Sequence, residues 1–127
     1  MHKSRFAGLI IDCQTADLDA AARFWSGALG FAAESGARAR EAAYRSLATP
    51  ADHPHIEIQR VQHESRVHLD IESDDIEAEV ARLERLGAQR LASVRDWVVM
   101  QAPTGQRFCV VPAVRADFAA RAHTWPD

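Results

Sequence analysis

Two stretches of the chain repeat one pattern of apolar and polar positions. The segment 6–13 is a short apolar run that contains β-branched residues, which is typical of a strand, and apolar positions at helical spacing follow over 17–30. The segment 67–72 alternates with period two, and a second helical pattern follows over 75–87. Each helical pattern opens after an aspartate and ends at a Leu-Gly pair, so the sequence predicts a tandem structural repeat.

Three short strand-like segments follow each helical pattern. We expect these strands at 31–34, 41–48 and 55–61 in the first half, and at 89–92, 97–101 and 107–111 in the second. The order β-α-β-β-β therefore occurs twice. It predicts an α+β fold of two tandem modules that form a concave, partly open, barrel-like sheet with the helices on its outer face.

The ends of the two helices carry recognisable signals. Thr15 or Asp17 is expected to cap the first helix, and Ser73 or Asp74 the second. Gly30 is a natural stop for the first helix, because glycine adopts the left-handed conformation without strain. The acidic residues of the second helix are expected to form a solvated face, namely Glu77, Glu79 and Glu84.

The length of 127 residues suits one domain with a hydrophobic core of its own. We expect a single domain over 1–127, with a first module at about 5–61, a second at about 66–112 and a C-terminal tail at 113–127. In the tail, we expect a short amphipathic helix that contains Val114 and Phe118, followed by a polar end.

Composition narrows the class of partner. The net charge of −3 argues against a general nucleic-acid binder, which needs a basic excess to neutralise phosphates. No apolar run approaches the ~20 residues that span a bilayer, so no membrane partner is expected. The N-terminus has no apolar region of a secretory signal, and Cys13 and Cys109 show no disulfide or zinc spacing. We therefore expect a cytoplasmic protein with buried, reduced thiols.

The strand alternation separates a core face from a polar face. The apolar positions expected under the helices are Leu9, Ile11, Ile56, Ile58, Leu69 and Ile71. The opposite faces would line a shared concavity, and their occupants include Gly8, Asp12, His55, Glu57, Gln59, His68 and Asp70. A concave sheet face with carboxylates and imidazoles is a candidate site for a small-molecule ligand.

Three segments carry recognisable motifs: Asp17 to Phe31, the strand His68-Leu69-Asp70 with the helix after it, and Ala102 to Cys109. Their order and spacing resemble the vicinal oxygen chelate superfamily, which contains glyoxalase I, bleomycin-resistance proteins and extradiol dioxygenases. The resemblance covers about 6–112 and is nearest to the branch called glyoxalase-like domains. It implies a ligand cup between the modules, and it implies a homodimer.

The resemblance also implies a divalent metal held by four strand positions. These positions correspond here to Gly8, Glu57, His68 and Cys109. Gly8 has no donor atom, so we expect no complete metal site and no cofactor. A weaker metal site from Glu57, His68 and Cys109 stays open as an alternative, and the thiolate would favour zinc in it. Asp12 and Asp70 are expected to serve mainly as acceptors in the turns that precede the helices.

Several side chains have a structural reading beside the functional one. Glu57 pairs with Arg60, Arg45 or His68, or serves as a site residue, because an unpaired buried carboxylate is costly. His53 and His55 surround Pro54 and are interpreted as a solvated loop. The expected ligand-binding residues are Tyr44, Trp97, Gln59 and Asp70, since aromatic walls and polar groups suit small-ligand sites.

Three functions follow from these observations. The first is a glyoxalase-like protein that binds a small polar organic molecule without the full metal site, with Glu57 as base and His68 as acid or orienting group next to a carbonyl. The second is a binding protein of the antibiotic-sequestering type, whose acidic cup suits a cationic guest. The third is a metal-dependent lyase, isomerase or dioxygenase.

Overall fold

The computed structural model describes residues 1–34 and 43–126, which divide into two compact units. The first unit is Gly8–His68, and the second unit joins Met1–Ala7 to Leu69–Asp127. The start of the expected strand 41–48 lies outside the described residues. No helix among those residues is both long enough and apolar enough to cross a membrane.

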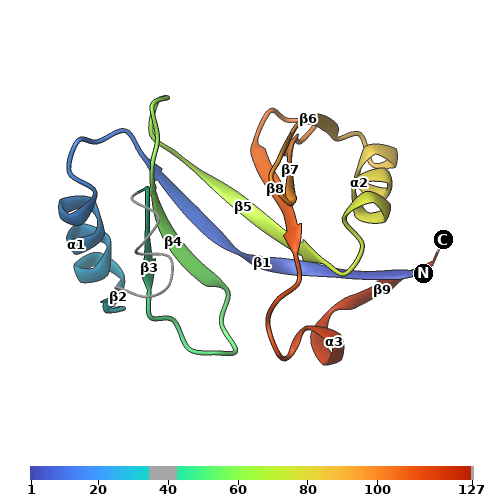
Figure 1. The fold of residues 1–127 in the computed structure, drawn as a ribbon, viewed down its shortest axis with the longest axis horizontal. Coiled ribbons are helices and arrows are strands. Elements are labelled where there is room, and N and C mark those ends of the chain that lie inside the picture. The colour runs from blue at the N-terminus through green and yellow to red at the C-terminus, as the bar shows by residue number, and fades with distance from the viewer. Residues whose placement is uncertain (35–42, 127) are drawn as a thin grey trace. The chain divides into compact units, whose positions relative to one another are not determined.

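The first unit is a small sheet with one helix. Its elements are β1 (His2–Cys13, from Gly8 onward), α1 (Leu18–Leu29), β2 (Ala33–Glu34), β3 (Tyr44–Leu47), β4 (His55–Arg60) and the first residues of β5 (Arg66–Ser73). The strands follow the order β2-β3-β4-β1. The pair β1–β4 is parallel, and the pairs β3–β4 and β2–β3 are antiparallel. Figure 1 shows α1 along one side of β2 and β3.

The second unit repeats this plan. Its elements are the start of β1, the rest of β5, α2 (Ile76–Arg85), β6 (Gln89–Val94), β7 (Trp97–Gln101), β8 (Arg107–Pro112), α3 (Phe118–Arg121) and β9 (His123–Trp125). The strand order is β5-β8-β7-β6. Here β5–β8 is the parallel pair, and β7–β8 and β6–β7 are antiparallel.

The two units therefore share one topology. In each, a strand leads into a helix, and three strands follow, of which the last returns parallel to the first. The predicted α+β fold with two βαβββ modules is confirmed, and within the described residues β2 and β6 are open sheet edges. The module limits 5–61 and 66–112 stay a prediction. Unlike those limits, the compact second unit includes the start of β1.

Aspartates cap both helices. The Asp17 carboxylate accepts a hydrogen bond from the Ala20 amide at 3.0 Å, and Gly30 adopts the left-handed conformation, as predicted. The Asp75 carboxylate accepts from the Ala78 amide at 3.0 Å, so the cap predicted at Ser73 or Asp74 was wrong. The Ser73 hydroxyl instead accepts a hydrogen bond from the Asp75 amide at 3.1 Å, so Ser73 holds the backbone of the residue that caps the helix.

Each unit buries its own core beneath its helix. The buried cluster of the first unit is Ile11, Leu18, Ala22, Leu47 and Ile58. That of the second unit is Val80, Leu83, Val98, Met100, Phe108 and Val110. The predicted core faces are largely confirmed, but Leu69 is 45% exposed and is not part of the buried cluster.

The tail differs from the polar end that the sequence predicted. β9 pairs antiparallel with the start of β1 (Figure 1). Trp125 lies opposite His2 in this pair. Phe118 is buried in α3, whereas Val114 is 86% exposed and takes no part in that helix. The Arg5 side chain bonds Asp117 at 2.6 Å and Glu72 at 2.6 Å, so an ion-pair cluster holds the start of α3.

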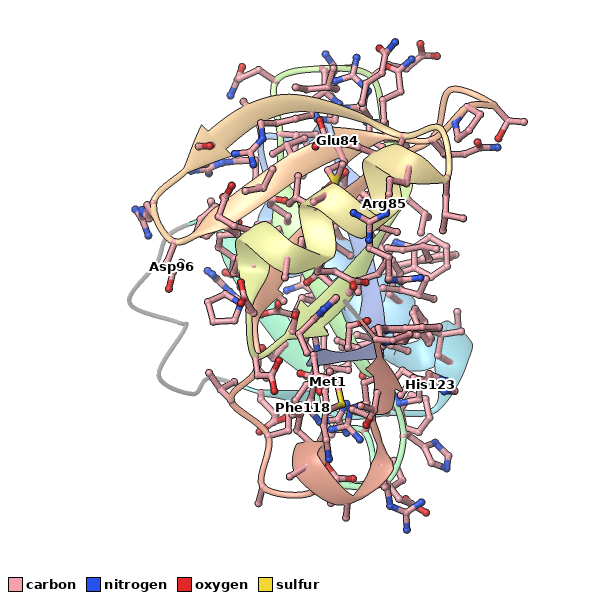
Figure 2. All side chains as sticks on the ribbon, turned by 90° about the vertical axis from the view of Figure 1, so that its right-hand side faces the viewer. Met1, Glu84, Arg85, Asp96, Phe118 and His123 are labelled. Carbon is pink, nitrogen blue, oxygen red and sulfur yellow. The ribbon has the colours of Figure 1, made fainter. Side chains whose placement is uncertain are left out.

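Glu79 is buried, although it was expected on a solvated face. Its carboxylate accepts hydrogen bonds from His2 at 2.7 Å and Ser4 at 2.7 Å, and two from Arg82 at 2.8 Å each. Burial raises the pKa of Glu79, but the bonds from Arg82, His2 and Ser4 outweigh burial and lower it to about 2. The prediction failed because helical spacing does not reveal that β1 supplies donors here. Glu84 does point outward (Figure 2).

Candidate functional site

The strand register of the first unit gathers polar side chains on one face. Gly8 lies opposite His55, Ile10 opposite Glu57 and Asp12 opposite Gln59. Tyr44 and Ser46 of β3 continue the same rows, opposite Gln59 and Glu57. The intervening residues, which include Ile11 and Ile58, pack toward α1. Because side chains alternate along a strand, the polar set faces away from α1. We call it the polar face: Tyr44, Ser46, His55, Glu57, Gln59, Asp12 and His68.

Asp12 and His68 form a hydrogen-bonded pair within this unit. The Nδ1 atom of His68 lies 2.7 Å from Oδ2 of Asp12. Asp12 is 3% exposed, and the His68 side chain is 14% exposed. A carboxylate only accepts hydrogen bonds, so the ring N–H at Nδ1 is the donor. Asp12 therefore fixes the orientation of the His68 ring.

Glu57 is the second buried carboxylate of the polar face. It is 8% exposed, and the Ser46 hydroxyl donates to its Oε2 at 3.4 Å. A ring nitrogen of His55 and a carboxylate oxygen of Glu57 lie within 4.8 Å of each other. The face thus combines a carboxylate and an imidazole at a distance that suits proton exchange with a shared ligand.

Gly8 is in tight contact with His55. A Cβ atom built on Gly8 would lie 2.2 Å from the His55 carbonyl oxygen and 2.5 Å from Cδ2 of its ring. The position has no room for any side chain. The solvated-loop interpretation of His55 was wrong, because His55 is the first residue of β4 and is half-buried, while His53 is exposed.

The remaining predicted site residues belong to the second unit. Asp70 lies opposite Cys109 in the β5–β8 pair, and Cys109 lies opposite Val99 of β7. Trp97 is two residues before Val99, so these side chains share the sheet face turned away from α2. Asp70 is 7% exposed, and a carboxylate oxygen of Asp70 lies within 4.8 Å of the Cys109 sulfur. The Trp97 ring has the Arg95 guanidinium 5.9 Å from its centroid.

One of the four metal positions implied by the superfamily resemblance does not fit this chain. Gly8 lacks a donor atom, and the His55 ring and carbonyl oxygen occupy the space that a longer residue at position 8 would need. In the first unit, His55 and Glu57 bring two ligand atoms together, and in the second unit Asp70 and Cys109 do so. Zinc sites use three or more protein ligands, so two such atoms alone do not complete a zinc site.

Sequence reasoning assigned Asp12 to the turn before α1, and that assignment was wrong. The turn is made by Thr15, whose hydroxyl accepts from the Asp17 amide at 3.0 Å, and by the Asp17 cap. Asp12 is instead committed to His68. Period-two alternation had already placed Asp12 on the same face as Gly8. Since Thr15 and Asp17 were both expected to cap the helix, Asp12 was not needed in the turn. This pattern was the sequence signal that Asp12 belongs to the site.

Two further interpretations of single residues are resolved. Arg45 bonds the Asp19 carboxylate at 2.9 Å on the α1 side of the sheet, so it was wrongly considered as a partner for Glu57. Burial raises the pKa of the Cys13 thiol, and the charge of Asp12 raises it further. Cys13 is therefore a weak nucleophile, and the thiols of Cys13 and Cys109 are partly buried rather than buried as predicted.

A family model places the chain among known domains. The model described as "Glyoxalase-like domain" matches residues 8–111, which includes the polar face and both helices that follow the repeated strands. No curated protein matches the sequence.

Several solved structures are similar in fold. A hypothetical protein from Bacillus halodurans C-125 superposes with a TM-score of 0.61 and 11% identity, over 87% of this chain and 95% of that one. Methylmalonyl-CoA epimerase from Mycobacterium tuberculosis superposes with a TM-score of 0.57 and 20% identity, over 91% of each chain. An extradiol ring-cleaving dioxygenase from B. fuscum superposes with a TM-score of 0.56 and 14% identity, over 87% of this chain and 32% of that one. At these identities, the likeness concerns the fold.

Proposed function

We propose that the chain, which belongs to the glyoxalase-like domain family, binds a small polar carbonyl compound at the polar face and transfers a proton next to the carbonyl. Glu57 acts as the base, and His68 acts as the acid or orienting group. The observation that carries the proposal is the hydrogen bond between His68 and the buried Asp12, on the same face as the buried carboxylate of Glu57.

The chemistry of this face supports proton transfer. An ionised carboxylate removes a proton, and an imidazole delivers one when both of its ring nitrogens carry hydrogen, so the two groups together provide a base and an acid. The Asp12 bond holds His68 in one orientation, which reduces the entropy lost when a ligand is positioned. The Ser46 hydroxyl donates to Glu57, and His55 adds a ring nitrogen near Glu57 that is able to bond a ligand.

One of the similar structures supports this class of reaction, and none identifies a substrate for this chain. One of them is named an epimerase of a methylmalonyl thioester, and epimerisation inverts a carbon centre. The α-carbon of a malonyl compound lies between two carbonyl groups, which make its proton removable by a carboxylate base. At 20% identity, we take from that protein the class of chemistry and not its substrate.

The test follows α-proton exchange in heavy water. Wild-type protein is incubated with a panel of small 2-oxo acids, hydroxy ketones and malonyl thioesters, and loss of the α-proton signal is followed by proton NMR. We expect Glu57→Gln and His68→Gln each to reduce the exchange rate by about 10²-fold or more, the usual contribution of general acid–base catalysis. Asp52→Asn, at an exposed loop position of the same unit, is the matched control. Equal rates in all four proteins would refute the assignment.

The second candidate is a binding protein that sequesters its ligand without converting it. The contact between Gly8 and His55 favours this candidate, because it removes one metal position of the superfamily. Two buried carboxylates on the face, Asp12 and Glu57, suit a cationic guest. A cationic compound should then raise the melting temperature of the wild-type protein but not that of Glu57→Gln. This result, together with no proton exchange on the carbonyl panel, would favour sequestration over proton transfer.

Metal content distinguishes the third alternative. We expect plasma mass spectrometry of protein grown with mixed trace metals to give well below one metal per chain. This follows from the empty donor position at Gly8. Near-stoichiometric metal that disappears in Glu57→Ala and His68→Ala would contradict the expectation and favour the lyase, isomerase or dioxygenase alternative. A cytoplasmic location is part of the proposal, and cell fractionation would check it.

A further inference from the structure

Asp12 has one carboxylate oxygen that its known contact does not use. The residue lies near the end of β1, is 3% exposed, and bonds His68 through Oδ2. The other oxygen, Oδ1, is buried, and no hydrogen-bond donor reaches it from the part of the chain that the structure describes. Buried carboxylate oxygens without a donor are rare, because the desolvation of the charge is then uncompensated.

The bond to Oδ2 also settles the proton position on His68. Nδ1 carries the hydrogen that it donates to the carboxylate, so Nε2 of the neutral ring carries the lone pair. Without such a partner, an imidazole ring exchanges its proton between the two nitrogens. Asp12 thus determines which ring atom is able to accept a proton.

We propose that Asp12 is the positioning residue of the site, with Oδ2 fixing the Nδ1–H form of His68 and Oδ1 accepting a hydrogen bond from the bound molecule. The proposal rests on the proposed function and narrows its substrate class. The ligand carries a hydrogen-bond donor, a hydroxyl or an ammonium group, besides its carbonyl. Such a donor removes the desolvation cost at Oδ1 only when the ligand is bound.

The first experiment needs no ligand. Long-range nitrogen–proton NMR spectra of ¹⁵N-histidine-labelled protein at pH 8.5 report which nitrogen of His68 is protonated. We expect the Nδ1–H form in wild type and a shift toward the Nε2–H form in Asp12→Ala. Asp17→Ala, which removes the α1 cap in the same unit without touching His68, should keep the wild-type form. A predominant Nε2–H form in the wild type would overturn the positioning role, even if Asp12→Ala does not fold.

The second experiment tests the donor at Oδ1 with matched probes. Hydroxyacetone is compared with methoxyacetone, and glycinamide with its trimethylammonium analogue, which keeps the charge but has no N–H on that nitrogen. Binding is measured by amide chemical-shift titration. We expect the donor-bearing member of one pair to bind about tenfold more tightly or better, and Asp12→Ala to remove the difference. The pair that discriminates identifies a hydroxyl or an ammonium as the donor. Equal or absent binding within both pairs would overturn the donor requirement.

The two proposals fail in different ways. If His68 holds the Nδ1–H form but Glu57→Gln and His68→Gln leave α-proton exchange unchanged, proton transfer is refuted and the positioning by Asp12 stands. If exchange depends on Glu57 and His68 while Asp12→Ala changes neither the ring form nor the pairwise affinities, the inference about Asp12 is refuted and the proposed function stands.

Discussion

At the scale of single residues, Gly8 and Asp12 decide what the polar face is able to do. The absence of a side chain at Gly8 lets the His55 backbone and ring lie against β1. The buried charge of Asp12 is stabilised by the His68 ring. Both residues precede α1 on one strand, and neither role is encoded in residue type alone.

Gly8→Ala should destabilise the protein. The new Cβ atom would lie 2.2 Å from the backbone carbonyl oxygen of His55, so β1 and β4 would have to separate. We expect a loss of about 1–3 kcal/mol in the free energy of unfolding, measured by urea denaturation. Gly27→Ala in α1 is the control, because nothing lies within 4 Å of its built Cβ. That change should be neutral or stabilising by up to about 1 kcal/mol. Equal effects of the two substitutions would contradict the close contact.

At the scale of elements, the two helices are stabilised in the same way at their starts and differently along their length. Asp17 and Asp75 each accept from the amide three residues on, both at 3.0 Å. α2 additionally buries Glu79 against the start of β1, and the Trp125 indole donates to Ser4 at 2.8 Å. The Arg82 guanidinium lies 3.9 Å from the centroid of the Trp125 ring. α2 thus holds both β1 and β9 in the second unit.

The two caps should contribute equally. Asp17→Ala and Asp75→Ala each remove one hydrogen bond of the same length to an otherwise unpaired helical amide. We expect each to cost about 1 kcal/mol of unfolding free energy, and the double variant to cost about the sum, since the caps lie in different units. Urea denaturation of the three variants provides the measurement. A loss of unfolding free energy in only one of the two single variants would show that the two caps do not stabilise their helices equally.

Glu79→Gln should change the dependence of stability on pH. The folded-state pKa of about 2 lies below the ordinary value of 4.5, so the wild-type carboxylate stabilises the fold above pH 4.5. That stabilisation is lost as the pH falls from 4.5 toward 2. We expect Glu79→Gln to cost on the order of 2 kcal/mol at pH 7 and progressively less across this window.

The exposed acid on the same helix is the control for Glu79. Glu84→Gln should alter stability by no more than about 0.5 kcal/mol at pH 7 (Figure 2). Urea midpoints at a series of pH values compare both variants with wild type. A cost for Glu79→Gln that stays constant down to pH 2 would mean that its ionisation is not coupled to folding.

At the scale of the whole molecule, the superfamily resemblance predicts a homodimer, and we keep this as a proposal. Sedimentation velocity should give about twice the mass of one chain at micromolar concentration. A single-chain mass throughout the concentration range would contradict it. Apolar side chains are exposed on each unit, such as Phe24 at 63% and Leu86 at 67%, and burial of such surface would stabilise an interface.

The sequence by itself determined the elements of the two repeated modules and the polar face. Period-two alternation in β1 and β4 separated Ile11 and Ile58 from Asp12 and Glu57, because successive side chains of a strand point to opposite faces. Helical spacing and the Gly30 stop located α1, since both signals are local. Such signals are read within a few neighbouring residues, so they need no knowledge of the fold.

Only the tertiary structure decided which polar groups meet. Asp12 and His68 are hydrogen-bonded although 56 positions separate them in the sequence, and Glu79 and His2 are hydrogen-bonded across 77 positions. Gly8 and His55 come into contact because β1 and β4 pair in one particular register, and Trp125 joins β1 through a strand that the sequence did not predict. Local propensity cannot specify these contacts, because a buried charge finds its partner only after distant segments have packed together.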